Sequence, residues 1–93
     1  MNDVLVKYKE ITVNLTTRQV VMDYTFKNVI VFDINKIAEL SKIYEALCTM
    51  EFIYDNYEFN SLEDAWIKAL EIREYMAENN IVEDIAINEV IKQ

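Results

Sequence analysis

The chain has 93 residues and a formal net charge of −8, and it contains one cysteine but no glycine, proline or histidine. A chain of this length forms one domain around one hydrophobic core. Without histidine it has no Ser-His or Cys-His nucleophile pair and no histidine metal site. Without glycine it has no P-loop and no dinucleotide-binding fingerprint. Acidic residues alone could still form a glycosidase-like pair or hold a divalent metal, but no calcium-loop spacing appears and no acidic residue lies in an obvious apolar pocket. We therefore expect a single domain over residues 1–93 that is not an enzyme and has no metal and no cofactor.

The composition also predicts where the protein works. Apolar residues make up 53% of the chain, which is too many for a disordered protein. No apolar run approaches the roughly 18 residues of a membrane-spanning helix, and the first residues lack the pattern of a secretory signal. One cysteine cannot form an intrachain disulfide. We expect a cytoplasmic protein, and the abundance of Asn, Ile, Lys, Glu and Tyr is typical of low-GC bacteria and their phages and plasmids.

The N-terminal third of the sequence has the residue types and the alternation of β-strands. Residues 4–13 predict one strand rich in β-branched and aromatic side chains, and residues 18–25 predict a second. The apolar run at residues 29–32 predicts a third strand, after a tight turn at Lys27-Asn28. Together these segments predict an antiparallel meander.

The middle of the chain changes to a helical period. Asp33 is a candidate N-cap, and residues 34–50 predict a helix. The apolar residues of this helix fall on one arc about 160° wide at 100° per residue. Cys48 lies at the edge of the arc, and we expect it to be a small buried side chain. The members of the arc are Ile37, Leu40, Ile43, Tyr44, Leu47, Cys48 and Met50.

Residues 51–60 have two interpretations. Aromatic residues flank the dipeptide Asp55-Asn56, and a two-residue turn of this type is typical of a β-hairpin. Alternatively, the preceding helix continues to Tyr54 and a loop follows. We favour the hairpin, which gives the element order β-β-β-α-(β-β)-α-α.

A second helix is predicted at residues 62–78. Asn60 and Ser61 are both candidate N-caps, each with an acidic residue three positions later. The dipeptide at residues 79–80, Asn-Asn, supplies the left-handed stop that glycine usually provides. Residues 81–93 favour a short helix, although their isoleucines also alternate as in a strand. The predicted fold class is α+β, with a small antiparallel sheet packed against two or three helices.

The charge is distributed unevenly along the sequence. Residues 1–44 contain five acidic and six basic residues, for a net charge of +1, whereas residues 45–93 contain twelve acidic and three basic residues, for −9. In the helix at 62–78 the acidic residues fall within an arc of about 100°, with Ile67 among them and Lys68 at its border. These acidic residues are Glu63, Asp64, Glu71, Glu74 and Glu78.

The opposite arc of this helix is apolar and is expected to face the core. Trp66 is the predicted anchor of that face. Arg73 lies in the middle of it, and a buried arginine requires a carboxylate partner, so we expect a structural ion pair. Alternatively, this part of the face is open to solvent or to a second subunit.

The acidic arc also has two interpretations. It is either a solvated face that keeps an apolar-rich protein in solution, or a row of carboxylates that takes the place of phosphates on a basic surface. On the second interpretation we expect an inhibitor that occupies the nucleic-acid-binding surface of a partner protein such as a nuclease, as anti-CRISPR-like proteins of phages and plasmids do. The expected partner-binding residues are Glu63, Asp64, Ile67, Glu71, Glu74, Glu78, Asp55, Tyr57 and Glu58.

The alternative function is a homo-oligomeric accessory protein whose acidic face serves only solubility. Its dimer would form through a sheet edge or through the face that carries Arg73. Lys7 and Lys9 are expected on a solvated strand face, and two lysines do not predict direct binding to nucleic acid. No basic amphipathic helix predicts binding to a membrane surface.

Overall fold

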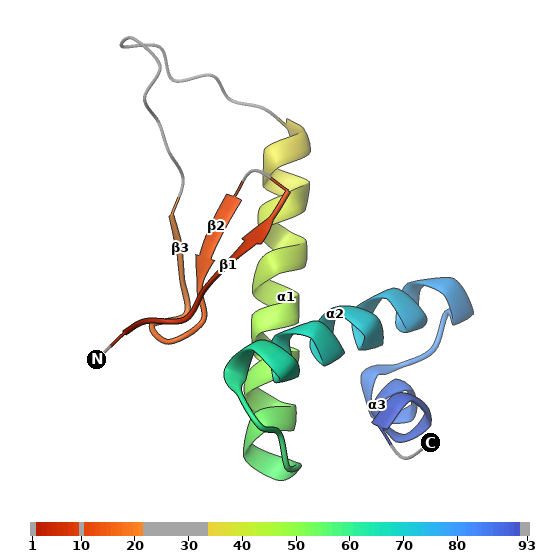
Figure 1. The fold of residues 1–93 in the computed structure, drawn as a ribbon. Coiled ribbons are helices and arrows are strands. Elements are labelled where there is room, and N and C mark those ends of the chain that lie inside the picture. Colours follow the sequence, from red (N-terminus) through yellow and green to blue (C-terminus); the bar gives the residue numbers. More distant parts are fainter. Residues whose placement is uncertain (1, 10, 22–33, 92–93) are drawn as a thin grey trace, which may run out of the picture.

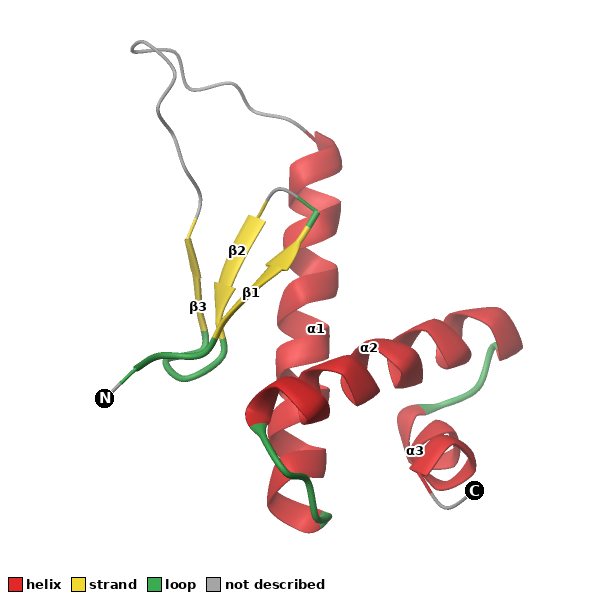
Figure 2. Cartoon of the chain, viewed as in Figure 1, coloured by secondary structure: helices red, strands yellow, loops and turns green. Residues whose placement is uncertain are grey.

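The computed structural model describes residues 2–9, 11–21 and 34–91. Three strands, β1 (Leu5–Tyr8), β2 (Ile11–Asn14) and β3 (Gln19–Val21), precede three helices, α1 (Ile34–Asn56), α2 (Leu62–Asn79) and α3 (Glu83–Ile91), in this part of the chain. The sheet lies along one side of α1, α2 crosses α1, and α3 lies below the far end of α2 (Figure 1). This arrangement confirms the predicted α+β class (Figure 2).

The three strands form one antiparallel sheet in the order β1-β2-β3. Val13 of β2 pairs with Val6 of β1 on one side and with Val20 of β3 on the other. Directly opposed residues of antiparallel strands point to the same face of the sheet. Because Val13 is fully buried, these three valines mark the face that joins the core, whereas Lys7 is exposed on the edge strand.

The single strand predicted at residues 4–13 is wrong, because the chain turns back after Tyr8. Tyr8 pairs directly with Ile11, and Lys9 between them has φ 57°, in the left-handed region. No glycine or asparagine marks this turn in the sequence. The Nζ of Lys9 lies 3.0 Å from Oε1 of Glu39, and this ion pair fastens the turn to α1. The turn also shifts the alternation, so Lys7, which pairs with Thr12, does not share the core face with Ile11 and Val13.

The connection from β2 to β3 is held by side-chain hydrogen bonds. The Oδ1 of Asn14 accepts hydrogen bonds from the backbone N–H groups of Thr16 and Thr17, at 3.0 and 3.1 Å. This is the local bonding that makes asparagine a turn residue. Arg18 has φ 62°, and its guanidinium donates to the carbonyl oxygens of Leu15 and Thr16. Polar side chains therefore form a turn that glycine often forms elsewhere.

β3 falls within the strand predicted at residues 18–25. The antiparallel meander is confirmed, but it consists of the two halves of the first predicted strand together with β3. The predicted turn at Lys27-Asn28, the predicted strand at residues 29–32 and the N-cap Asp33 lie outside the described residues.

The hairpin predicted at residues 51–60 is wrong, because α1 continues through Asn56. The helical period places Ile53 on the core side, where it is fully buried. The side chain of Asn56 donates a hydrogen bond of 2.8 Å to the carbonyl oxygen of Phe52 near the end of the helix. The alternative interpretation, a longer helix, is confirmed, and the helix ends two residues beyond Tyr54. Asparagine and aspartate favour tight turns and helix ends alike.

The buried face of α1 is rotated relative to the predicted apolar arc. Tyr44 is 52% exposed, and Cys48 is exposed rather than buried, so the prediction of a buried cysteine is wrong. Thr49, which falls outside the predicted arc, is fully buried. The arc held more apolar side chains than the neighbouring elements cover, so one edge of it faces solvent. The buried residues of α1 are Ile43, Ala46, Leu47, Thr49, Met50 and Ile53.

α2 begins and ends at residues predicted to cap it. The Oγ of Ser61 accepts a hydrogen bond of 3.1 Å from the backbone N–H of Asp64, which makes Ser61 the N-cap. Asn80 has φ 50°, and its N–H donates to the carbonyl oxygen of Met76. This left-handed C-cap is the role that glycine has in most helices. The tail then forms α3, which confirms the helical interpretation of residues 81–93 for the nine residues that α3 contains.

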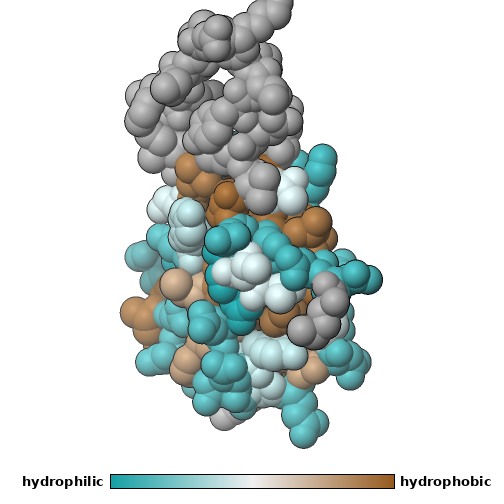
Figure 3. Space-filling model, turned by 90° about the vertical axis from the view of Figure 1, so that its left-hand side faces the viewer, coloured by the Kyte–Doolittle hydropathy of each residue, from teal (hydrophilic) through white to brown (hydrophobic). Residues whose placement is uncertain are grey.

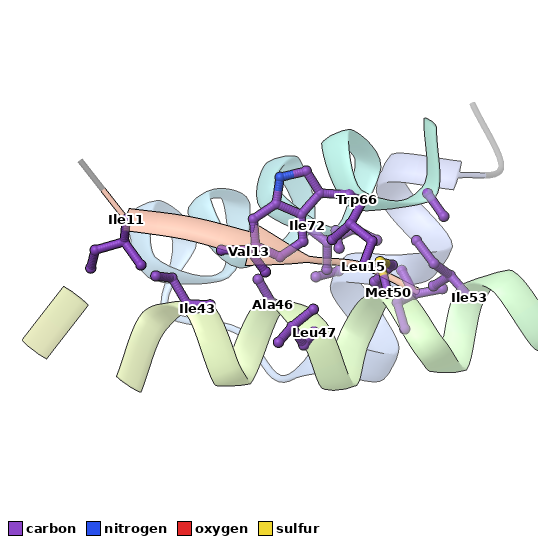
Figure 4. Packing of buried hydrophobic residues seen from close by; sticks show 14 residues of the cluster. Ile11, Val13, Leu15, Ile43, Ala46, Leu47, Met50, Ile53, Trp66 and Ile72 are labelled. Carbon is purple, nitrogen blue, oxygen red and sulfur yellow. The ribbon is translucent and has the colours of Figure 1, made fainter. Parts of the chain in front are cut away.

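One core joins the sheet to the helices. Ile11 and Val13 of β2 lie over α1, with Trp66 and Ile72 of α2 beside them (Figure 4). Trp66 is only 3% exposed, which confirms it as a core anchor. This packing sets the rotation of α2 about its own axis, and it therefore decides which face of α2 meets solvent.

Candidate functional site

The acidic face predicted for α2 lies on the surface of the molecule. The side chains in it are all exposed, whereas Ala65, Trp66, Ala69 and Ile72 on the opposite face are buried. At 1.5 Å per residue the face extends over about 22 Å of the helix. We call it the acidic stripe; its members are Glu63, Asp64, Glu71, Glu74 and Glu78.

Little positive charge accompanies the acidic stripe. The Nζ of Lys68 lies 3.0 Å from Oε2 of Glu71, an i,i+3 pair in which both side chains are partly exposed. Pairs of this kind contribute only a few tenths of a kcal/mol. The other four carboxylates form no ion pair with any described residue. Most of the charge of the stripe is therefore available to ions or to a partner.

An apolar side chain lies within the acidic stripe. Ile67 is 48% exposed and stands four residues after Glu63 and four before Glu71, so the three share one face of α2. An exposed apolar residue surrounded by charge resembles the centre of a protein interface, where apolar anchors are ringed by polar groups. The stripe thus combines charge with one potential anchor.

The other predicted partner-binding residues lie at the corner between α1 and α2. Asp55 belongs to the last turn of α1, and Tyr57 and Glu58 follow it in the loop. The structure brings Tyr57 and Glu58 together with Asp64, because all three line one surface hollow. Asp55 is not among the residues that line it. The hollow therefore joins the loop to the N-terminal end of the acidic stripe.

The C-terminal half of the acidic stripe has a different neighbourhood. Glu74 lines a groove of about 610 Å³ between α1 and α2. Lys42, Glu45 and Arg73 are the other charged residues that line this groove. Glu74 therefore shares its groove with charges of both signs, whereas the hollow at the other end of the stripe is lined by aromatic, amide and acidic residues.

Arg73 forms the ion pair expected of it, and a second one as well. Its Nη2 lies 3.0 Å from Oε2 of Glu45 in α1, and its Nη1 lies 3.3 Å from Oε2 of Glu83 in α3. Glu83 also accepts a hydrogen bond of 3.3 Å from the buried hydroxyl of Thr49. These contacts connect all three helices. The sequence offered no sign of Glu83 as the partner, beyond its place in the first turn of the last helix.

Two contacts outside the acidic stripe raise pKa values. The hydrogen bond to Glu39, supported by its charge, raises the pKa of Lys9 above its ordinary value. The hydroxyl of Tyr75 in α2 donates a hydrogen bond to Glu89 in α3, and this bond raises the pKa of Tyr75. Both contacts join elements of the fold, so we assign them a structural role.

The chemical groups that the acidic stripe presents to solvent are carboxylates. Among the described residues, no group of three or more cysteine or acidic residues is arranged to hold a metal ion. No described helix is both long enough and apolar enough to cross a membrane. Seen from the side that carries the sheet, the surface alternates between hydrophilic residues and small apolar patches (Figure 3). Comparison with protein-family models, with curated proteins and with solved structures finds no match to this chain, so its function has to be inferred from its own residues.

Proposed function

We propose that this chain is a non-enzymatic, cytoplasmic inhibitor that places its acidic stripe on a basic, nucleic-acid-binding surface of a partner protein. The observation that carries the proposal is the row of five exposed carboxylates on one face of α2, of which only Glu71 pairs with a described cation. Complementary charge speeds the encounter of two proteins and disfavours wrong partners. Ile67 supplies an apolar contact within the same surface.

The density of charge limits what the acidic stripe can imitate. B-DNA of the same length, about 22 Å, carries about 13 phosphate charges at one per 1.7 Å, whereas the stripe carries five. The stripe can therefore replace the few phosphates that one basic patch contacts, but not a whole duplex. An anti-defence inhibitor of the phage or plasmid type, anti-CRISPR-like in size and charge, would act in this way by competing for the patch.

The proposal is tested by capturing partners from a host lysate with matched charge variants. One variant, Glu74→Gln with Glu78→Gln, neutralises two charges of the acidic stripe. The control, Glu51→Gln with Asp84→Asn, neutralises two exposed acids elsewhere, on α1 and α3. We expect the first variant to lose the partner and the control to keep it. The two variants have the same net charge, so a general effect of net charge on capture would affect both equally.

Salt provides a second arm of the same experiment. At about 0.5 M NaCl the Debye length falls to roughly 4 Å, and a contact made by exposed charges weakens. We expect a partner held by the acidic stripe to elute at that concentration. A partner that resists salt and binds the Glu74/Glu78 variant as tightly as the wild type would refute the proposal.

A second candidate function, self-association, is supported by a different surface. Tyr44 and Phe52 on α1 are 52% and 47% exposed, and Cys48 lies between them at four-residue spacing. Residues at this spacing share one face of a helix, so they form an exposed apolar strip. Light scattering after size exclusion distinguishes the candidates, since a dimer through α1 would be weakened by Phe52→Asp and not by changes in the acidic stripe.

A further inference from the structure

The hollow at the α1–α2 corner combines aromatic and acidic side chains. It encloses about 630 Å³ and is open to solvent. Aromatic rings and carboxylates make up most of its lining, and no cationic residue lines it. The lining residues are Tyr54, Tyr57, Glu58, Phe59, Asn60 and Asp64. Most of them lie in the loop between the helices, and Asp64 belongs to the first turn of α2.

The aromatic rings of the hollow are positioned by the fold itself. Tyr57 and Phe59 are partly buried and pack against the hydrophobic core, whereas Tyr54 is 40% exposed. The backbone N–H of Tyr57 donates a hydrogen bond of 2.9 Å to the carbonyl oxygen of Ile53, which anchors the start of the loop. Ser61 caps α2 at the other end of the loop. A site held in this way loses little conformational entropy when a ligand enters it.

The carboxylates of the hollow have no partner of their own among the described residues. Glu58 and Asp64 are both exposed, and neither forms an ion pair or a side-chain hydrogen bond with another described side chain. The hydrogen bond between Ser61 and Asp64 uses the backbone N–H of Asp64 and leaves its carboxylate free. The hollow is thus lined by aromatic rings and carries negative charge that no described cation balances.

From this combination we infer that the hollow receives the guanidinium group of an arginine side chain from the partner protein. The inference rests on the proposed function and names one contact of it, at the N-terminal end of the acidic stripe. A guanidinium is flat, so it stacks on an aromatic face while its N–H groups reach carboxylate oxygens in the same plane. A lysine ammonium is a compact, strongly hydrated charge that cannot stack in this manner. Arginine is also enriched among the residues that dominate protein interfaces.

The test uses the isolated chain and small probes, so it does not require the partner. N-acetyl-arginine amide is titrated into the labelled protein, and backbone and aromatic resonances are followed by NMR. We expect saturable shifts confined to the rings of Tyr54, Tyr57 and Phe59 and to the amides around Glu58 and Asp64. The citrulline analogue, which has the same shape but no charge, should bind at least five times more weakly, and so should the lysine analogue.

Two variants locate the binding within the hollow, each with a matched control. Tyr54→Leu removes a ring of the hollow, whereas Phe52→Leu removes an exposed ring on another face of α1. Glu58→Gln removes a carboxylate of the hollow, whereas Glu51→Gln removes one outside it. We expect Tyr54→Leu and Glu58→Gln to weaken arginine binding at least fivefold and the controls to leave it unchanged. Far-UV circular dichroism verifies that all four variants are folded.

Several outcomes would overturn the inference. These are the absence of saturable shifts, equal binding of arginine and citrulline, tighter binding of lysine, and equal effects of the hollow variants and their controls. None of the variants in this test changes a residue of the acidic stripe, so the partner capture with the Glu74/Glu78 variant still decides the proposed function. Conversely, arginine binding that persists while a salt-resistant partner is captured normally by the Glu74/Glu78 variant would refute the proposed function and keep the hollow as an arginine site.

Discussion

The two faces of α2 differ in what they contribute to the fold. One face buries Trp66 and Ile72 against the sheet and α1, and it fixes the position of the helix. The other face holds the acidic stripe and contributes nothing to the core. Glu74 and Glu78 on it form an i,i+4 pair of like charges, which is weakly destabilising. The comparison teaches that Glu74 and Glu78 are not explained by folding, since their repulsion slightly destabilises the helix, whereas Glu63 and Asp64 lie in its first turn, where acidic residues favour it.

The largest expected difference in stability is between substitutions at two adjacent residues, one on each face of α2. Trp66→Ala should destabilise the protein by about 3–5 kcal/mol, because it leaves a large cavity in the core. Ile67→Ala, one residue further along, should change the free energy of unfolding by less than about 0.5 kcal/mol, because its side chain is half exposed. Urea denaturation followed by tryptophan fluorescence serves for Ile67→Ala, and circular dichroism serves for both. Similar losses in the two variants would mean that the faces are wrongly assigned.

A smaller effect on stability is expected when the cation of each face is replaced. Arg73 bonds Glu45 and Glu83 and so connects three helices, whereas Lys68 bonds only Glu71 on the same helix. We expect Arg73→Gln to cost about 1–2 kcal/mol and Lys68→Gln a few tenths, because the network of Arg73 is partly shielded from solvent. Chemical denaturation of the two variants measures the difference. The prediction fails if Lys68→Gln costs as much as Arg73→Gln.

The charges of the acidic stripe should have a small effect of the opposite sign. Glu74→Gln with Glu78→Gln removes a like-charge pair and should stabilise the protein by a few tenths of a kcal/mol, or about 1–2 °C in melting temperature. The gain should vanish at 1 M salt, where the Debye length is about 3 Å. Differential scanning calorimetry at both salt concentrations tests this. A loss of stability would show that the two carboxylates take part in the fold.

The smallest effect concerns Tyr75, which contacts α3 from beside the acidic stripe. Its hydrogen bond to Glu89 raises the pKa of Tyr75, so the folded state holds the phenolic proton more tightly than the unfolded state does. The bond therefore stabilises the fold below the ordinary tyrosine pKa of about 10, and this contribution is lost as the pH rises through the raised value. Glu89→Gln should lower the pKa of Tyr75 toward its ordinary range. An NMR titration of the ¹³C-labelled tyrosine ring measures it, with Asp84→Asn as the control, and an unchanged midpoint in Glu89→Gln would contradict the assignment.

Much of the helical half of the molecule could be predicted from local patterns. The core face of α2, its Ser61 cap and its Asn80 stop all follow from residue types at fixed spacing, and each is present in the structure. Arg73 was recognisable as a residue in need of a carboxylate because a charge stood on an apolar face. Its second partner was not recognisable, since Glu83 approaches it only after α3 has packed against α2.

The errors fall where a local signal has two physical meanings. Asp55-Asn56 suits a hairpin turn and a helix end equally well, and the packing of Ile53 on the core decides for the helix. The turn at Lys9 carries no turn residue, although Lys9 has a left-handed backbone, and its side chain pairs with Glu39 of the distant helix α1. In both places the local sequence carries no signal of the contact that forms between elements distant in the chain.

The sequence by itself determined that α2 has an acidic face and an apolar face, because the period of a helix converts spacing into sides. It could not determine how much of the apolar arc of α1 the other elements cover, so Cys48 was expected to be buried and is exposed. Nor could it determine what surrounds each end of the acidic stripe. Only the packing of α1 against α2 brings Tyr57 and Glu58 to Asp64 at one end, and Lys42 and Glu45 of α1 to Glu74 at the other. Those neighbours come from different elements, and their distances depend on the crossing of the two helices, which no local pattern encodes.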